Sequence, residues 1–469
     1  MITLTQDQTE LVGKLRAAMS SGHKHNVLQA ATGSGKTIMS SFMVQAAISK
    51  GKKVWFTVPR KELLRQTALT FKGFGVPHSY IAAGQQYNPY QKAQICSIGT
   101  LMGRLDNVKA PDLAFIDEAH YGGDGLERII FWLKKQGAWT VLLSATPWKL
   151  SGQGLGRYAT NMICGPPIRW LIDNKRLSDY RLFAPSKPDL SGIKTTAGDY
   201  AKGQLAERME QDRVLIGNAV THYKDHALGK LNVAYCVSRK HSELVAESFR
   251  NQGIAAVHID GETPDEMRRK IIRGFAKREI TVLTNCDLLT FGFDLSSQVG
   301  FDVTVESMSD LRPTKSLALQ MQKWGRVLRK KDFPAMIFDH AGNVLNKDGT
   351  PNHGLPCEER HWTLEDREKK ERSEKTSFPV RQCPSCFFCH SPAPACPSCG
   401  EVYVIKHRQI DEVDGELSEI SIADRRAAAE KKNRDKFYQL VGVAKKRGYA
   451  NPEIWAKNCM MVEGKHGIS

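Results

Sequence analysis

The feature that most constrains the fold of this chain is a short glycine-containing stretch, residues 30–37, with the sequence Ala-Ala-Thr-Gly-Ser-Gly-Lys-Thr. It follows the short apolar run 26–29 and precedes a segment of small and apolar residues with helical spacing, 38–48. This order predicts a strand, a tight loop and a helix, an arrangement that presents backbone amides to phosphate groups. Ala30 stands where loops of this kind commonly carry a first glycine, so the prediction depends on partners elsewhere in the chain.

The residue types inside this loop suit a nucleotide. Gly33 and Gly35 let the backbone turn so that successive amide groups point at phosphate oxygens. Lys36 is predicted to reach the β and γ phosphates, and the Thr37 hydroxyl to ligate Mg²⁺. The predicted ATP-binding residues of the loop are Thr32, Gly33, Ser34, Gly35, Lys36 and Thr37.

Length and charge set the class of protein. A chain of 469 residues has room for two or three domains with separate cores. Its 67 Lys and Arg residues exceed its 50 Asp and Glu residues, and the net charge of +17 favours a polyanionic partner, nucleic acid first. No window approaches the roughly 20 apolar residues of a membrane span, and the N-terminus lacks an apolar signal core. We therefore expect a soluble, intracellular protein.

An acidic pair follows the predicted buried strand 113–116. Asp117 and Glu118 begin the sequence Asp-Glu-Ala-His, and carboxylates at the end of a buried strand are costly unless they have a function. Asp117 is predicted to hold Mg²⁺ through water, and Glu118 to polarise the water that attacks the γ-phosphate. His120 is a candidate bridge to the next segment.

Other polar residues follow neighbouring strands. The carboxyl ends of parallel strands meet at one edge of a sheet, where ligands gather. Runs 53–58, 93–98 and 139–143 end in Pro-Arg, Gly-Thr and Ser-Ala-Thr. The predicted nucleic-acid contacts are Pro59, Arg60, Thr100, Ser144 and Thr146, the last two also as a relay of nucleotide state.

Gln8 is the candidate contact for adenine. It lies upstream of the phosphate loop, and its amide offers both a donor and an acceptor to the base edge. An exposed helix glutamine explains the same residue equally well.

The second half of the chain repeats the strand and helix alternation. Strands 231–237, 254–259 and 280–284, with helices between them, predict a second parallel sheet, and further strands are expected near 299–305 and 335–338. Two such sheets can clamp one nucleotide.

Two arginines in this half suit phosphate. Arg326 and Arg329 are three residues apart on the predicted helix 316–330, so they share a face. Their guanidinium groups are suited to γ-phosphate charge in the transition state. Gln322, predicted to lie at the nucleotide, and Gly325 complete the pattern.

Five of the eleven cysteines crowd between 383 and 399. Two Cys-Pro-Ser-Cys repeats on a short hairpin give four thiolates at tetrahedral Zn²⁺ spacing. The preferred ligands are Cys383, Cys386, Cys396 and Cys399. Cys389 and His390 remain alternative ligands, since Cys386 and Cys389 share the same spacing.

The ordered motifs resemble those of superfamily 2 DEAD/DEAH-box helicases, and residues 311–314 and 339–343 with the cysteine ribbon look closest to RadD-type bacterial DNA-repair helicases and related phage helicases. The resemblance covers roughly residues 1–400. It implies two RecA-like parallel-sheet domains, 1–165 and 166–350, with ATP in the cleft. A charged linker, 351–380, a zinc ribbon, 381–403, and a basic helical tail, 404–469, are expected to follow.

The resemblance also implies residue roles. Lys36 and Thr37 carry over as phosphate and Mg²⁺ contacts, Asp117 and Glu118 as catalytic acids, and Arg326 and Arg329 as γ-phosphate sensors. Gly292 and Asp294 couple the nucleotide to the bound strand. The N-terminal glutamine motif lacks the Arg-Pro-Tyr lead common among relatives.

The expected function is a Mg²⁺- and ATP-dependent motor on single-stranded or branched DNA that acts in repair, recombination or replication, in a phage or a bacterium. Recombination or single-strand-binding proteins are possible partners. One rival is an RNA helicase, and another is an ATP-gated clamp that holds nucleic acid without unwinding it.

Overall fold

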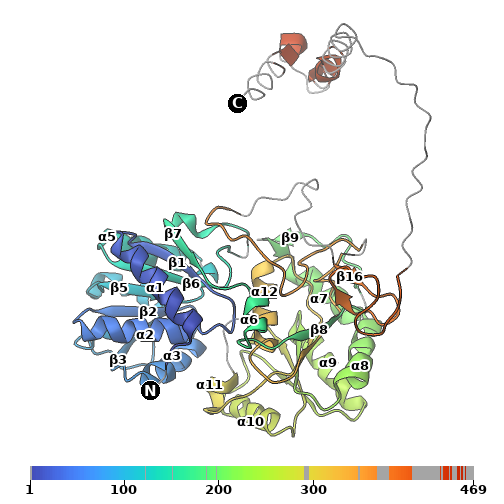
Figure 1. The fold of residues 1–469 in the computed structure, drawn as a ribbon, viewed down its shortest axis with the longest axis horizontal. Helices are drawn as coiled ribbons and strands as arrows, with labels where there is room; N and C mark the ends of the chain where they lie inside the picture. The colour runs from blue at the N-terminus through green and yellow to red at the C-terminus, as the bar shows by residue number, and fades with distance from the viewer. Residues whose placement is uncertain are drawn as a thin grey trace. The chain divides into compact units, whose positions relative to one another are not determined.

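A computed structural model describes residues 3–121, 123–149, 151–185, 187–196, 198–289, 295–346, 349–366 and 380–403, with scattered tail positions between 434 and 460. The chain divides into two compact units, Met1–Tyr403 and Val404–Ser469. The first unit holds two lobes, drawn in blue and in green to yellow in Figure 1. Most of the expected helical tail lies outside the described residues, although 437–442 are helical.

The first lobe is a seven-stranded parallel sheet in the order β3-β4-β2-β5-β6-β1-β7. The strands are β1 His25–Gln29, β2 Val54–Val58, β3 His78–Ile81, β4 Ala93–Ser97, β5 Leu113–Ile116, β6 Trp139–Ser144 and β7 Asn161–Cys164. The helices are α1 Gln6–Ser20, α2 Lys36–Ser49, α3 Lys61–Gly73, α4 Ile98–Met102 and α5 Asp124–Lys135. Short 3-10 turns lie at Leu105–Asn107, Ala119–Tyr121 and Leu155–Arg157.

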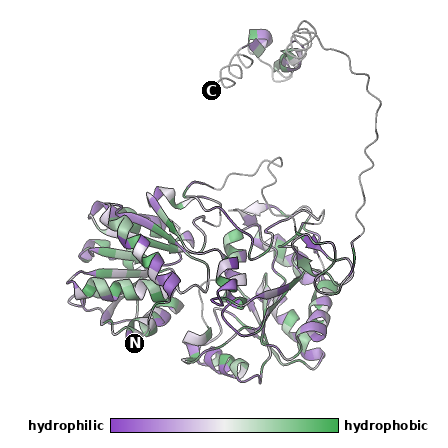
Figure 2. Ribbon diagram, viewed as in Figure 1, coloured by the Kyte–Doolittle hydropathy of each residue, from purple (hydrophilic) through white to green (hydrophobic). Residues whose placement is uncertain are grey.

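Both faces of this sheet are covered, which explains its apolar strands. Phe56 packs in a core with residues of α1, α2 and α3, whereas Trp55, one residue earlier, packs in a core with α4 and α5. Successive side chains of a strand point to opposite faces, so each strand feeds both cores. Hydrophobic residues accordingly follow the strands and the inner faces of the helices in Figure 2.

The second lobe is a six-stranded parallel sheet in the order β12-β13-β11-β14-β15-β8. The strands are β8 Tyr180–Phe183, β11 Asn232–Cys236, β12 Ala256–Ile259, β13 Val282–Cys286, β14 Ser307–Asp310 and β15 Ala335–Asp339. The helices are α6 Ile168–Asp173, α7 Lys202–Gln211, α8 Arg213–Ala227, α9 Arg239–Asn251, α10 Asp265–Ala276, α11 Leu295–Val299 and α12 Leu317–Val327. Two small antiparallel pairs complete the described part, β9 Thr195–Thr196 with β10 Asp199–Tyr200 and β16 Arg381–Gln382 with β17 Cys389–His390.

The two parallel sheets confirm the predicted fold class. The strand expected near 299–305 is misplaced, because α11 ends at Val299, residues 300–306 form no strand, and the strand follows at Ser307–Asp310. This strand, Ser-Met-Ser-Asp, is polar in composition yet fully buried, so apolar patterning could not find it. No helix among the described residues is long and apolar enough to cross a bilayer.

Candidate nucleotide site between two lobes

The phosphate loop joins β1 to α2 as expected. Gly33 and Gly35 both have φ of +88°, a backbone conformation that favours glycine, so their predicted conformational role is confirmed. The buried Lys36 donates from Nζ to the carbonyl oxygens of Ala30, at 3.0 Å, and Ala31, at 3.4 Å. These carbonyls hold the ammonium inside the loop, where a phosphate would be a stronger, charged partner.

Gln8 lies directly against this loop. Its Nε2 donates to the Ser34 carbonyl at 3.0 Å, and its Oε1 accepts from the Thr5 amide at 3.1 Å. A Cβ on Gly35 would collide with the Gln8 amide, so the glycine is required for this contact as well as for its φ. The structure therefore ties Gln8 to the phosphate loop, and its predicted contact with adenine stays a prediction.

The acidic pair lies across the loop, after β5. Glu118 has φ of +48°, a left-handed conformation that costs a non-glycine residue on the order of 1–3 kcal/mol and tends to occur at functional sites. Burial raises the pKa of Asp117 to about 7, and the negative charge of Glu118 adds to the rise while Lys36 opposes it. A cation beside Asp117 would offset this cost.

The residues present fit Mg²⁺. The Asp117 carboxylate and the Thr37 hydroxyl are oxygen ligands of the kind that Mg²⁺ binds. Burial disfavours the charged form of the Asp117 carboxylate, so a bound cation would stabilise it. When bound, the ion would neutralise charge on the transferring phosphoryl group.

The second lobe reaches this pair through Gln322 on α12. Its Nε2 donates to Glu118 Oε2 at 3.2 Å and to His120 Nε2 at 3.0 Å. Burial lowers the pKa of His120, so the ring is neutral and its Nδ1 is free to donate to Ser144 Oγ at 2.8 Å. The Ser144 hydroxyl then donates to the Thr146 carbonyl. A continuous chain of hydrogen bonds thus joins the second lobe, the acidic pair and the segment after β6.

Ser144 and Thr146 are 0% and 1% exposed. Their burial does not fit direct contact with a polymer, but it suits the other predicted role, a relay. Pro59 and Arg60, where α3 begins, are half-buried, and Thr100 Oγ1 accepts from the Ala83 amide at 3.0 Å. Gly292 and Asp294 lie outside the described residues.

A close approach brings α12 onto the phosphate loop. A Cβ on Gly325 would collide with the side chain of Thr32, and a Cβ on Gly33 would lie 3.1 Å from Leu177 Cδ2 and 3.9 Å from Arg329 Cγ. Arg326 and Arg329 also border a small cavity with Tyr235 on the second lobe. The structure thus brings the arginine segment to the loop, while the role of both guanidiniums as γ-phosphate sensors stays a prediction.

Replacing Gly325 with alanine is expected to lower the nucleic-acid-stimulated kcat for ATP by about tenfold or more, because the added methyl group separates α12 from Thr32. Because glycine in a helix interior costs about 1 kcal/mol relative to alanine, the substitution by itself stabilises the α12 helix. Gly217→Ala in α8 is the matched control, since nothing lies within 4 Å of its Cβ position. Equal kcat values for the two variants in steady-state assays would contradict the close approach.

A buried polar cluster fixes α12. Lys323 Nζ donates to both carboxylate oxygens of Asp310 at 2.7 Å, and the two side chains are 0% and 1% exposed. Asn343 Nδ2 and Gln320 Nε2 also donate to Asp310 Oδ2, each at 3.0 Å. Sequence reasoning missed this cluster, although Lys323 lies among ten buried residues of α12, where a solvated lysine is not expected.

A strap, which we define as residues 353–366, returns from the second lobe to the first. His353 Nε2 bonds to the Thr314 carbonyl at 2.9 Å on the second lobe. On the first lobe, the rings of Trp362 and Trp148 lie 5.0 Å apart. The Gly154 amide donates to Asp366 Oδ1 and the Gly156 amide to the Leu364 carbonyl, each at 2.8 Å. This half of the expected linker is therefore packed against both lobes.

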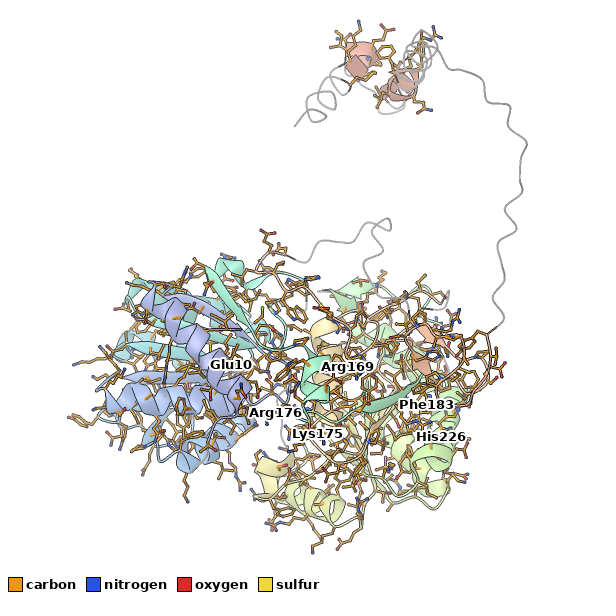
Figure 3. All side chains as sticks on the ribbon, viewed as in Figure 1. Glu10, Arg169, Lys175, Arg176, Phe183 and His226 are labelled. Atoms are coloured by element: carbon orange, nitrogen blue, oxygen red, sulfur yellow. The ribbon has the colours of Figure 1, made fainter. Side chains whose placement is uncertain are left out.

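A further ion pair joins the lobes near α1. Arg176 Nε donates to Asp7 Oδ1 at 3.0 Å, and Figure 3 places Arg176 beside that helix. Asp7 is buried, so this pair is less screened by solvent than a surface pair.

Trp362→Ala is expected to speed amide hydrogen exchange at Gly154 and Gly156 by about tenfold or more, since each tenfold step corresponds to about 1.4 kcal/mol of lost local stability. Both amides donate to the strap that the tryptophan anchors. Trp170→Ala, at a tryptophan 39% exposed on α6, is the control. Unchanged exchange at both glycines would mean that the Trp148–Trp362 contact does not hold the strap.

The four predicted zinc ligands come together. The sulfur atoms of Cys383, Cys386, Cys396 and Cys399 all lie within 4.8 Å of one another. The Cys383–Cys399 and Cys386–Cys396 pairs are 3.6 and 3.7 Å apart, close to the roughly 3.8 Å that four tetrahedral Zn–S bonds of about 2.3 Å require. The donor set therefore fits Zn²⁺.

The alternative ligands are engaged elsewhere. Cys389 packs in the core of the second lobe, and burial raises the pKa of its thiol. His390 bonds through Nε2 to the Tyr403 hydroxyl at 2.7 Å and through Nδ1 to the Ser391 carbonyl. The arrangement favours the two matching repeats.

The cysteine segment docks on β8, the edge strand of the second sheet. The Ala184 amide donates to the Phe387 carbonyl at 3.1 Å, and Arg181 Nη2 donates to Ser398 Oγ at 2.8 Å. The rings of Phe183 and Phe388 lie 5.4 Å apart. The segment therefore covers a sheet edge that would otherwise expose unpaired backbone groups.

Two parallel sheets that meet over a phosphate loop and an acidic pair define an ATP-hydrolysing, nucleic-acid-dependent enzyme. Residues 1–149 match the family described as "Type III restriction enzyme, res subunit", and residues 218–331 match "Helicase conserved C-terminal domain". The chain belongs to the superfamily 2 helicases, which confirms the resemblance at the level of the superfamily, and the closeness to RadD-type helicases stays a prediction.

The chain is also similar to individual proteins. A 51.5 kDa protein of a Lactococcus phage is 32% identical over 363 residues, 77% of this chain and 74% of that protein. The putative ATP-dependent helicase IRC3 of Saccharomyces cerevisiae is 26% identical over 328 residues, 66% of this chain and 47% of that protein, so the chain spans about half of the yeast relative. The type ISP restriction-modification enzyme LlaBIII bound to DNA shares the fold, with a TM-score of 0.53 at 14% identity over 72% of this chain and 27% of that one.

Proposed function

We propose that this helicase is a DNA-stimulated ATPase that translocates on or unwinds DNA in repair, recombination or replication. The observation that carries the proposal is the contact of Gln322 with both Glu118 and His120. Through it, the position of the second lobe depends on the hydrolysis site, which is what a motor needs to convert hydrolysis into movement.

Two comparisons support DNA as the polymer. The first lobe matches a restriction-enzyme subunit, and a restriction-modification enzyme of the same fold is bound to DNA. The net charge of +17 supports a phosphate-rich partner in general. The similar phage protein supports a phage or bacterial source, and hence action in the cytoplasm of a bacterial host cell.

In the proposed cycle the chain's own residues divide the work. Lys36 and the amides of the phosphate loop hold the β and γ phosphates, and Thr37 with Asp117 places the metal. Glu118 orients and deprotonates the attacking water, and Arg326 and Arg329 stabilise the charge that develops on the γ-phosphate. When the γ-phosphate is lost, the hydrogen bonds from Gln322 to His120 and from His120 to Ser144 transmit the change to the segment after β6.

Strand displacement tests the proposal against the clamp and the RNA helicase. Forked DNA, forked RNA and a streptavidin-blocked single strand are incubated with protein and either ATP or a non-hydrolysable analogue. We expect DNA strands or streptavidin to be displaced only with ATP. Tight DNA binding without displacement on any substrate would mean a clamp, and displacement confined to RNA would move the protein to the rival enzyme.

We also propose one structural Zn²⁺ per chain, held by the four clustered cysteines. Elemental analysis of purified protein is expected to give about one Zn per chain. Cys383→Ser is expected to lose the metal, and Cys357→Ser, at a thiol outside the cluster, to keep it. A zinc content that is zero, or that is equal in both variants, would contradict the site.

A further inference from the structure

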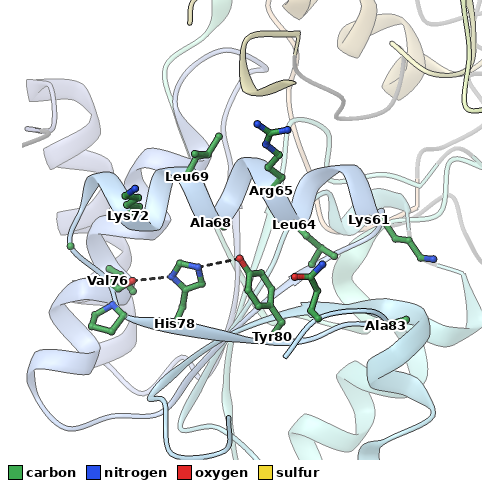
Figure 4. Close-up of a pocket in the computed structure, with 13 residues that line it drawn as sticks. Lys61, Leu64, Arg65, Ala68, Leu69, Lys72, Val76, His78, Tyr80 and Ala83 are labelled. Atoms are coloured by element: carbon green, nitrogen blue, oxygen red, sulfur yellow. Dashed lines mark hydrogen bonds between the residues drawn. The ribbon is translucent and has the colours of Figure 1, made fainter. Parts of the chain in front are cut away.

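The first lobe carries a groove of about 760 Å³ outside the nucleotide site, between α3 and the edge strand β3 (Figure 4). We propose that this groove binds single-stranded nucleic acid, with the phosphodiester backbone along α3 and a base against Tyr80. The inference rests on the proposed function, because it extends the path of the same polymer beyond the strand ends of the first lobe.

The charged side chains that the structure describes along the α3 side of the groove are all basic. Lys61, Arg65 and Lys72 line it and are exposed, and none of the described lining residues carries a carboxylate. Two other exposed cations of this lobe, Lys52 and Arg157, are each paired with a carboxylate, of Asp112 and Glu127 respectively. Among the described residues, none of the three groove cations forms an ion pair, so they are available to neutralise phosphates and to release counterions.

The spacing of these cations suits a chain of phosphates. Residues 61, 65, 69 and 72 follow the i, i+4, i+8, i+11 pattern, so they form one stripe on α3. At a rise of 1.5 Å per residue, Lys61 and Arg65 are about 6 Å apart along the helix axis and Arg65 and Lys72 about 10 Å. Leu69, 44% exposed, interrupts the stripe with an apolar contact.

The floor of the groove offers a surface for a base. His78 Nδ1 donates to the Val76 carbonyl at 3.0 Å, and the Tyr80 hydroxyl donates to His78 Nε2 at 3.4 Å, as the dashed lines of Figure 4 show. The two rings meet edge to face at 5.5 Å. This arrangement fixes the half-buried Tyr80 ring, and base stacking on such a ring contributes about 1–3 kcal/mol.

One end of the groove opens at both predicted contact sites of the first lobe. Lys61 directly follows Arg60, and Ala83, at the same end, donates its amide to Thr100 Oγ1. A strand bound at Arg60 and Thr100 therefore lies next to this end of the groove.

An acidic peptide is the rival occupant, and the edge strand argues against it. Peptides that add to a sheet need a free strand edge. Ser79 of β3 bonds through Oγ to the Gln86 carbonyl at 3.1 Å and to the Asn88 amide at 2.7 Å, so the loop after β3 is tied to this strand, and an added peptide would have to fit beside that loop.

Charge reversal with length-graded oligonucleotides tests the proposal. The double variant Arg65→Glu/Lys72→Glu is compared with Lys50→Glu/Lys135→Glu, which changes the net charge equally at exposed positions before β2 and at the end of α5. Fluorescence anisotropy with a non-hydrolysable ATP analogue measures the affinity for oligonucleotides of about 6 and about 15 nucleotides, across the range of known single-strand site sizes.

We expect the groove variant to lose at least tenfold in affinity for the longer oligonucleotide and little for the shorter one. Its slope of log K against log salt should fall in magnitude by about 1.4, at about 0.7 per lost phosphate contact. ATP hydrolysis without polymer stays unchanged in both variants, since Arg65 and Lys72 lie outside the nucleotide site.

Two results would contradict the proposal that this groove binds single-stranded nucleic acid. One is equal affinity of the two double variants for the longer oligonucleotide, and the other is selective loss of binding to a labelled poly-glutamate peptide with nucleic-acid affinity intact. Both are distinct from failure of the proposed function, which would appear as a wild-type protein whose ATP hydrolysis ignores every polymer.

Discussion

Lys36→Ala is expected to reduce polymer-stimulated ATP hydrolysis by at least two to three orders of magnitude, the effect typical of losing one preorganised group that stabilises transition-state charge. The ammonium lies inside the phosphate loop, bonded to the Ala30 and Ala31 carbonyls, where it can exchange these weaker partners for phosphate oxygens. Steady-state phosphate release measures the effect.

Lys50→Ala is the matched control, because Lys50 caps the opposite end of the same helix and is exposed. It is expected to hydrolyse ATP at the wild-type rate. Wild-type activity in the Lys36→Ala variant would show that the phosphate loop does not take part in ATP hydrolysis, even though the fold contains it.

Lys323→Met is expected to destabilise the second lobe by about 3–5 kcal/mol, the cost of leaving one member of a buried ion pair without its partner. The methionine keeps most of the side-chain volume, so the loss reports the charge on Asp310 rather than a cavity. Urea unfolding monitored by circular dichroism measures the change.

Lys330→Met, at an exposed lysine just beyond α12, should change the stability by less than about 0.5 kcal/mol. Combining Asp310→Asn with Lys323→Met should restore most of the loss, because asparagine carries no charge yet still bonds to Asn343 and Gln320. A single variant as stable as the wild type would show that the pair does not fix α12.

Much of this molecule could be predicted from its sequence, because its signals are local. Gly33 and Gly35 mark a loop that needs positive φ, and buried apolar strands such as Val54–Val58 mark a covered parallel sheet. The cysteine repeats likewise indicated which four sulfurs would meet. Each of these features follows from residues near one another in the chain.

What the sequence could not reveal depends on residues far apart. Asp310 and Lys323 are buried only because β14, α12 and the segment around Asn343 pack together around them. The polar composition of β14 also prevented its prediction as a strand. Pattern reasoning treats polar residues as exposed, so it also missed the packed strap around Trp362.

The same limit applies inside the site. The motifs located Glu118, His120 and Gln322 separately, but only the fold shows that one amide group bonds to the other two side chains. Likewise, Gly325 reads as part of an arginine motif, whereas the structure shows that its missing Cβ makes room for Thr32.

The most direct test of the central claim is steady-state ATP hydrolysis by the purified protein with no polymer, single-stranded DNA, forked DNA and RNA at matched nucleotide concentration. We predict low hydrolysis without polymer and strong stimulation by DNA, because a polymer that bridges the lobes favours the contact of Gln322 with Glu118 and His120. Hydrolysis that is equal under all four conditions would contradict a DNA motor, and stimulation by RNA alone would assign the motor to a different polymer.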